Sequence, residues 1–232
     1  LRARANGSYI SVCRGSGAKP ARAAELEALG RLLYLAMGGF NGMTILDTVI
    51  VGAGQAGLGV SYFLQQNGLN HIVFEQGRIG ESWLSQRWDS FKLNTPNFMN
   101  TLPGFHDDGL EPDGFCGPDE LVHYFERYIE HFQLPVRTGY TVVSVEQSKD
   151  EGHFIVKTKT NGQREESVTS RSVVIASGSL NKPKFPATRS QLPNDIVQLH
   201  TADYRSPVAL PPGAIVIVGS GQSGCQITED LL

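Results

Sequence analysis

Cysteine is scarce in this chain, and no two cysteines form a close pair. The three cysteines, Cys13, Cys116 and Cys225, are widely spaced, and the sequence contains no C-x-x-C motif. A disulfide framework, a zinc site and a redox-active dithiol all need cysteines at closer spacing. We therefore exclude all three and expect a reducing, cytoplasmic compartment. The six histidines share no cluster either, so the sequence predicts no metal site.

A strong net charge and a long apolar run are also missing. The 232 residues carry a net charge of -3, and 40% of them are hydrophobic and 19% charged, as is ordinary for a globular protein. Without a basic field or a charged tail, we exclude nucleic acid as a partner. Within residues 1–42 the longest apolar run, Leu32–Met37, is far shorter than the ~20 residues of a membrane span. The sequence therefore predicts no membrane span.

Residues 1–42 differ in composition from the remainder. They contain six basic and two acidic residues and begin with Leu1 rather than Met. Met43 lies five residues before the first strand that the sequence predicts, where proteins with such a strand usually begin. We therefore expect residues 1–42 to be an upstream or non-native extension with little order. The alternative is a targeting peptide, because such peptides are also rich in Arg and poor in acids.

A glycine cluster follows a short β-branched run near the start of the main sequence. The pattern predicts a strand at Thr48–Val51, an amphipathic helix that ends at Asn67 and Gly68, and a second buried strand at His71–Glu75. Residues 47–75 thus have the ~30-residue length of one βαβ unit.

The turn inside this unit reads G-x-G-x-x-G and consists of Gly52, Ala53, Gly54, Gln55, Ala56 and Gly57. The first glycine permits a tight turn, the second lets the backbone approach a pyrophosphate, and the third allows the helix to pack closely on the strand. The phosphates would lie on unpaired N–H groups at the positive end of the helix. Glu75 ends the next strand, about 20 residues on, where an acid binds a ribose hydroxyl. The pattern predicts a dinucleotide site.

Residues 77–118 lack periodicity and are rich in Gly, Pro and aromatic residues. Loops longer than ~15 residues are usually functional or disordered, and the aromatic content favours function, through Trp83, Trp88, Phe91 and Phe98. Pro118 then begins a helix whose apolar residues recur at helical spacing and are expected to form core, namely Leu121, Phe125, Tyr128 and Phe132.

The pattern after Gly139 changes to short alternating strands. They are expected at Thr141–Glu146, Phe154–Thr160 and Gln163–Val168, and a separate buried strand at residues 172–178 follows. We therefore expect an α/β, Rossmann-like FAD/NAD(P)-binding fold with three layers and a parallel sheet, into which an antiparallel meander is inserted.

A second glycine motif lies near the end of the sequence. A strand is predicted at residues 214–219, and it leads into Gly219, Ser220, Gly221, Gln222, Ser223 and Gly224. Two such motifs in one chain predict one site for a flavin dinucleotide and one for the nicotinamide that reduces it. NADPH and NADH both stay open, because the side chains that separate them would follow the next strand.

Combined with the two motifs, the stretches GRIGESWLSQRWDSFKLNTPNFMNTLPG at residues 77–104 and VVIASG at residues 173–178 resemble the class B flavoprotein monooxygenases. The sequence is most similar to bacterial flavoproteins often labelled as associated with potassium transport (CzcO-like). The resemblance covers residues 44–232. It implies that residues 43–206 are an incomplete FAD-binding domain and that residues 207–232 begin an NAD(P)-binding domain.

The resemblance implies that the first motif binds the cofactor. Gly52, Gly54 and Gly57 would bind the FAD pyrophosphate, and Glu75 would bind its ribose. Val143 would contact the adenine through its backbone.

Other implied cofactor residues lie outside the first motif. Trp83, Arg87 and Trp88 would lie along the flavin; the alternative for the aromatic side chains is plain packing under a loop. Asn94 would lie beside the reactive edge of the flavin. The turn over the cofactor would be formed by Ala176, Ser177 and Gly178.

One stretch departs from the pattern of the family. The expected F-x-G-x-x-x-H-x-x-x-[FY] keeps His200 and Tyr204 but has Asn194 and Ile196 where Phe and Gly belong. His200 is as well explained by a structural role in a linker as by a role at the cofactor. The chain is therefore similar to the family without being a standard flavin-containing or Baeyer-Villiger monooxygenase.

The activity implied by the resemblance is that of an FAD- and NAD(P)H-dependent monooxygenase. The flavin takes a hydride, captures O2 as a C4a-(hydro)peroxide and delivers one oxygen atom to a small-molecule substrate. One alternative is a flavin-dependent reductase or oxidase that passes electrons to a carrier, and another is a redox or nucleotide sensor that regulates a transporter. The substrate stays open, and so does the oligomeric state, for which a homodimer is one option.

Overall fold

The computed structural model describes residues 2–5, 8–14, 45–106, 109–148, 152–179 and 182–232. The chain divides into two compact units. The first comprises Leu1–Gln76 and Pro135–Ala176, and the second comprises Gly77–Leu134 and Ser177–Leu232. Among the described residues, no helix is both long and apolar enough to cross a membrane.

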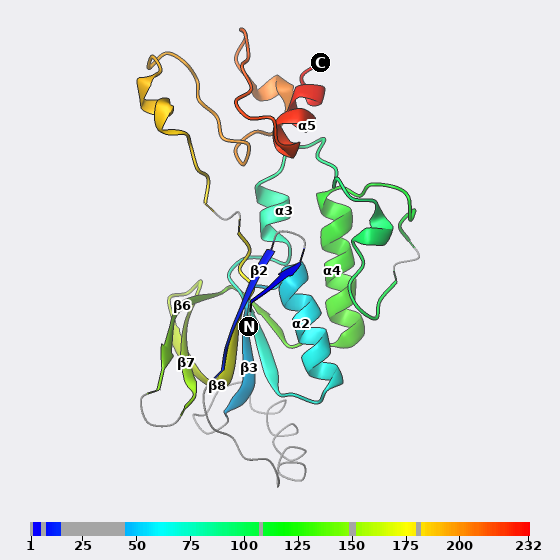
Figure 1. Cartoon of the computed structure of the whole chain (residues 1–232), viewed down its shortest axis with the longest axis vertical. Helices are drawn as coiled ribbons and strands as arrows, with labels where there is room; N and C mark the ends of the chain where they lie inside the picture. The colour runs from blue at the N-terminus through cyan, green and yellow to red at the C-terminus, as the bar shows by residue number, and fades with distance from the viewer. Residues whose placement is uncertain (1, 6–7, 15–44, 107–108, 149–151, 180–181) are drawn as a thin grey trace. The chain divides into compact units, whose positions relative to one another are not determined.

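A four-stranded parallel sheet forms the centre of the first unit (Figure 1). Its strands lie in the order β8, β3, β4, β5, with bounds Glu165–Ile175, Leu46–Val51, His71–Glu75 and Val136–Thr138. Helix α2, Gln55–Gln66, connects β3 to β4 and contacts both strands. The predicted βαβ unit is therefore confirmed, and its strands contribute the buried core of the unit, including Val49, Ile72 and Phe74.

An antiparallel meander extends this sheet, as the sequence predicts. Strand β6, Tyr140–Gln147, pairs with β7, Phe154–Thr160, and β7 pairs with the first half of β8. The second half of β8 pairs with β3 in parallel. The expectation of two strands at 163–168 and 172–178 is wrong, because one continuous strand takes part in both the meander and the parallel sheet.

Two further strands continue the sheet beyond β8. Strand β1, Arg2–Ala5, pairs with β2, Ser8–Arg14, and β2 pairs antiparallel with the end of β8. Residues 15–44 lie outside the described part, so the assignment of residues 1–42 as an extension stays a prediction.

The described part of the second unit contains three α-helices joined by irregular segments (Figure 1). They are α3, Glu81–Ser85, α4, Pro118–Phe132, and α5, Gln222–Asp230, with short turns of 3-10 helix at Asn97–Met99, Ala187–Gln191 and Pro207–Ala209. Helix α4 begins at Pro118 as predicted. Its start is fixed by Glu120, whose carboxylate accepts a hydrogen bond of 2.7 Å from the backbone N–H of Gly117.

The prediction of a strand at residues 214–219 is wrong, because the structure shows no strand there. The side chains of Val216 and Val218 are 83% and 81% exposed. β-Branched residues favour a strand only where a neighbouring strand supplies hydrogen bonds and packing. Among the described residues, no strand pairs with this segment.

Candidate nucleotide-binding site

The first glycine motif forms a tight turn between β3 and α2. Gly52 has a φ of 103°, which favours glycine, and its N–H donates to the carbonyl of Phe74 at 2.7 Å. A Cβ atom on Gly57 would lie only 1.9 Å from the carbonyl oxygen of Gly52. The first and third glycines are therefore required by the backbone itself.

Gly54 has a different role from its two neighbours. It caps the N-terminus of α2 without a side-chain hydrogen bond, and no acidic residue lies in the first turn, which contains Gln55 and Ala56. A Cβ atom on Gly54 would meet no protein atom within 4 Å. The helix thus presents uncapped N–H groups and its positive end to open space, which suits an anion such as a pyrophosphate.

Glu75 lies at the carboxyl end of β4 and reaches this turn. Its carboxylate accepts a hydrogen bond of 2.9 Å from the N–H of Ala53. The adjacent strand also ends here, since the N–H of Ala176 donates to the carbonyl of Val51 at 2.8 Å. The structure therefore brings the glycine turn, Glu75 and Ala176 together at the carboxyl ends of parallel strands, where ligands of such sheets bind.

Val143 lies at an irregularity of β6. The strand register passes from Val142, opposite Thr158, to Ser144, opposite Lys157, so Val143 has no partner in the ladder. Its side chain is 53% exposed. A bulged residue has backbone groups that do not serve the ladder, which is compatible with the predicted backbone contact to adenine.

Ser177 and Gly178, which directly follow β8 and Ala176, belong to the second unit. Both are exposed, and Gly178 has a φ of 79°. The backbone thus turns directly after the sheet, and the second residue of this turn needs the conformational freedom of glycine.

Trp83 and Arg87 form a stack in the second unit. The guanidinium carbon of Arg87 lies 4.8 Å from the centre of the Trp83 ring and 5.4 Å from that of Phe91. Burial lowers the pKa of Arg87 from its usual value, although a guanidinium remains charged at neutral pH. The stack is a half-buried positive charge on an aromatic surface.

Trp88 is only 3% exposed and packs with Tyr204 and Ile227. The Trp88 and Tyr204 rings lie 6.4 Å apart, and the Tyr204 hydroxyl donates to Asp230 on α5 at 2.6 Å. These contacts correspond to the packing alternative that the sequence leaves open for Trp88.

Asn94 is exposed on a segment that is fixed on both sides. The N–H of Leu93 donates to the carbonyl of Cys116 at 3.0 Å, and the hydroxyl of Thr95 donates to the side chain of Asn100 at 2.5 Å. A rigid backbone therefore carries a solvent-accessible amide.

The second glycine motif repeats the geometry of the first. Gly219 has a φ of 115°, Gly221 caps α5 with open space around it, and a Cβ atom on Gly224 would lie 2.2 Å from the Gly219 carbonyl. Gln222 and Ser223 form the first turn of α5. This motif belongs to the second unit, whereas Gly52–Gly57 belongs to the first.

Two residues that shape the Trp83 segment received no structural role in the sequence analysis. The Arg205 guanidinium donates to the carbonyls of Ser85 and Arg87 and so connects the linker to the Trp83 segment. Gly80 has a φ of 68°, and a Cβ atom there would lie 2.3 Å from Val122. Gly80 and Trp83 form a G-x-x-W spacing in the stretch that carries the family resemblance, whereas no local pattern indicates Arg205.

Comparison with known proteins gives a family and several relatives. The family described as pyridine nucleotide-disulphide oxidoreductase matches residues 49–232. The uncharacterized oxidoreductase CzcO of Bacillus subtilis (strain 168) is 37% identical over 80% of this chain and 51% of its own length. Senecionine N-oxygenase of Tyria jacobaeae is 24% identical over 78% of this chain and 43% of its own length.

A solved structure has the same fold. The flavin-containing monooxygenase of Stenotrophomonas maltophilia superposes with a TM-score of 0.69 at 25% identity, over 82% of this chain and 55% of that one. The predicted α/β dinucleotide-binding fold class is confirmed. The chain spans about half the length of the curated relatives that it matches.

Proposed function

The chain belongs to the pyridine nucleotide-disulphide oxidoreductase family, and from this premise we propose that its first glycine motif binds FAD. We further propose that the whole protein is an NAD(P)H-dependent flavoprotein monooxygenase. The observation that carries the proposal is the hydrogen bond from Ala53 to Glu75, which joins an uncapped helix N-terminus to an acid at the end of the next strand.

The residues of the first unit offer groups that suit parts of FAD. The open space at Gly54 and the uncapped N–H groups of α2 suit the pyrophosphate, and Glu75 offers an acceptor for a ribose hydroxyl. Val143, outside the strand ladder, can offer backbone groups to the adenine. Ala176 follows the neighbouring strand β8, and Ser177 and Gly178, which belong to the second unit, continue the turn.

Residues of the second unit would act near the flavin ring. When bound, FAD accepts a hydride and activates O2, which are reactions that side chains alone do not supply. The stack of Arg87 on Trp83 supplies a positive charge and an aromatic surface, and Asn94 supplies an exposed amide. We propose that Gly219–Gly224 binds the pyrophosphate of NADPH or NADH.

The alternatives have less support. The sequence has no C-x-x-C for a dithiol relay, and two relatives described above are named as oxygenases. A reductase, an oxidase and a sensor are therefore not favoured. A small-molecule substrate and O2 are the proposed reactants. The cytoplasmic location stays a prediction.

An FAD titration of the purified chain tests the flavin site. Flavin absorbance and fluorescence are followed for the unchanged chain, for Gly54→Asp and for the matched control Gly221→Asp. An aspartate at residue 54 would place negative charge where the pyrophosphate approaches, so FAD should bind about 100-fold more weakly or not at all. In Gly221→Asp the FAD affinity should stay within about twofold. Equal affinities in all three folded chains would contradict the site.

Oxygenation is tested separately on the whole protein. With NADPH and isotopically labelled O2, a monooxygenase transfers the label to the product, whereas a reductase or an oxidase does not. Label in hydrogen peroxide and none in the organic product would overturn the activity proposal and leave the flavin site intact.

A further inference from the structure

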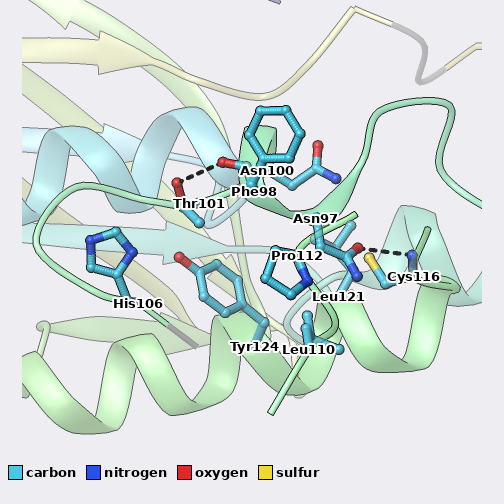
Figure 2. A pocket seen from close by; sticks show the side chains of 10 residues that line it. All are labelled: Asn97, Phe98, Asn100, Thr101, His106, Leu110, Pro112, Cys116, Leu121 and Tyr124. Carbon is cyan, nitrogen blue, oxygen red and sulfur yellow. Dashed lines mark hydrogen bonds between the residues drawn. The ribbon is translucent and has the colours of Figure 1, made fainter. Parts of the chain in front are cut away.

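A cavity of about 420 Å³ lies within the second unit, between loop residues 97–106 and 110–116 and α4 (Figure 2). Figure 2 shows Leu121 and Tyr124 on α4 facing the loop segment that carries Asn97, Phe98 and Thr101. The volume falls within the range of ~300–1,000 Å³ that is typical of small-molecule sites.

The walls of the cavity are held by their own hydrogen bonds. The Asn97 amide accepts from the N–H of Cys116 at 2.9 Å and donates to the carbonyl of Glu111 at 2.8 Å. The Tyr124 hydroxyl accepts from the N–H of Leu102 at 2.6 Å. These bonds fix the loop on α4, so the cavity is formed before any ligand binds.

The lining chemistry selects for an uncharged ligand. Its apolar walls include Phe98, Leu110, Pro112 and Leu121. No Asp, Glu, Lys or Arg belongs to the described lining, so an ionic ligand would lose its hydration without gaining a partner. His106 and Tyr124 lie at one end, and Cys116 lies at the other beside the Asn97 amide, so polar groups stand at both ends of the apolar walls (Figure 2).

The cavity is connected to the segment of Asn94. The side chain of Asn100, which lines it, donates to the carbonyls of Thr95 and Pro96 at 3.0 and 3.2 Å and accepts from the hydroxyl of Thr95. Thr95 follows Asn94 directly. The cavity wall is therefore bonded to the segment that carries the residue which the proposed function places beside the flavin.

We propose that this cavity binds a small uncharged molecule with an apolar body, and that this molecule is the oxygenated substrate. Only the claim that this molecule is the oxygenated substrate rests on the proposed function. The binding claim concerns the residues of the cavity and needs neither FAD nor turnover.

Ligand-observed NMR on the purified chain tests binding. The probes are thioanisole, which is neutral and carries an oxidisable sulfur, and benzoate, which has a similar size and a negative charge. Leu110→Trp places a large ring in the cavity, and Phe115→Trp is the matched control, because Phe115 is 50% exposed and outside the lining. Circular dichroism shows whether each variant is folded.

We expect thioanisole to bind the unchanged chain and Phe115→Trp with similar affinity, and Leu110→Trp about tenfold or more weakly. Benzoate should give no saturable signal. The absence of thioanisole binding to the unchanged chain, or equal binding of benzoate, would overturn the cavity proposal. If thioanisole binds but the whole protein does not oxygenate it, the cavity stands and its role as the substrate site falls. If FAD binds and thioanisole does not, only the cavity proposal fails.

Discussion

The two glycine-rich turns have nearly the same geometry in different surroundings. Both begin with a glycine at positive φ, 103° at Gly52 and 115° at Gly219, and in both the third glycine lies against the carbonyl of the first. The segment before the first turn is a buried strand between two neighbours. The segment before the second turn is exposed and unpaired.

This difference shows that the glycine turn is formed by local residues, whereas the strand before it needs neighbouring strands. The turn forms wherever three glycines at the right spacing remove the steric cost of a tight approach. The strand before it forms only when other strands supply hydrogen bonds and apolar contacts. The second turn is instead held by α5, through Ile227 in the Trp88 cluster and through Asp230.

The largest expected effect comes from adding one methyl group to the first turn. In Gly57→Ala the new Cβ would lie 1.9 Å from the Gly52 carbonyl, and both backbones belong to packed elements. We expect the free energy of unfolding to fall by about 3 kcal/mol. Urea unfolding followed by far-UV circular dichroism measures this value.

Gly224→Ala is the matched control for that substitution. Its Cβ would be almost as close, 2.2 Å from the Gly219 carbonyl, but the segment before Gly219 can shift because no strand pairs with it within the described residues. The loss should be less than half as large. Equal losses would mean that the second turn is packed as firmly as the first, and the comparison would fail.

A smaller effect on the free energy of unfolding is expected when a hydroxyl group is introduced into the segment before each glycine turn. Val49 is fully buried in β3, so Val49→Thr should lower the free energy of unfolding by about 2 kcal/mol. Val218 is 81% exposed, so Val218→Thr should stay within about 0.5 kcal/mol of the unchanged chain. The same urea titration measures both, and a large loss in Val218→Thr would show that residues 214–219 are buried in solution.

The same distinction explains what the sequence could predict. The βαβ unit, the turn at Gly52 and the start of α4 at Pro118 are each indicated by a pattern of residues close in sequence, and all three are confirmed. The loop before α4 depends on Asn97, whose side chain bonds to residues 14 and 19 positions away. Such contacts leave no periodic signal, so the loop and its cavity could not be predicted.

The third prediction concerns the proposed contact of Glu75 with the ribose of FAD. Glu75→Gln keeps the shape of the side chain but removes the charge that strengthens hydrogen bonds to the proposed ribose. We expect FAD affinity to fall about tenfold, which corresponds to ~1.4 kcal/mol. Glu165→Gln is the control, because this acid pairs with Lys159 at the surface of the same unit. A loss in both variants would indicate a general effect of charge instead of a ribose contact.

The smallest expected effect on stability concerns the hydrogen bond from Tyr204 to Asp230, which holds α5. Burial, followed by the hydrogen bond to Asp230, raises the pKa of Tyr204 above its usual value. Because the folded pKa is raised, the stability from the protonated phenol is present below the unfolded pKa of about 10 and is lost as pH rises above it. Tyr204→Phe should therefore cost about 1 kcal/mol at neutral pH. The difference from the unchanged chain should shrink above about pH 10. Urea titrations at a series of pH values measure it, and a difference that stays constant into the alkaline range would show that α5 is held by packing alone.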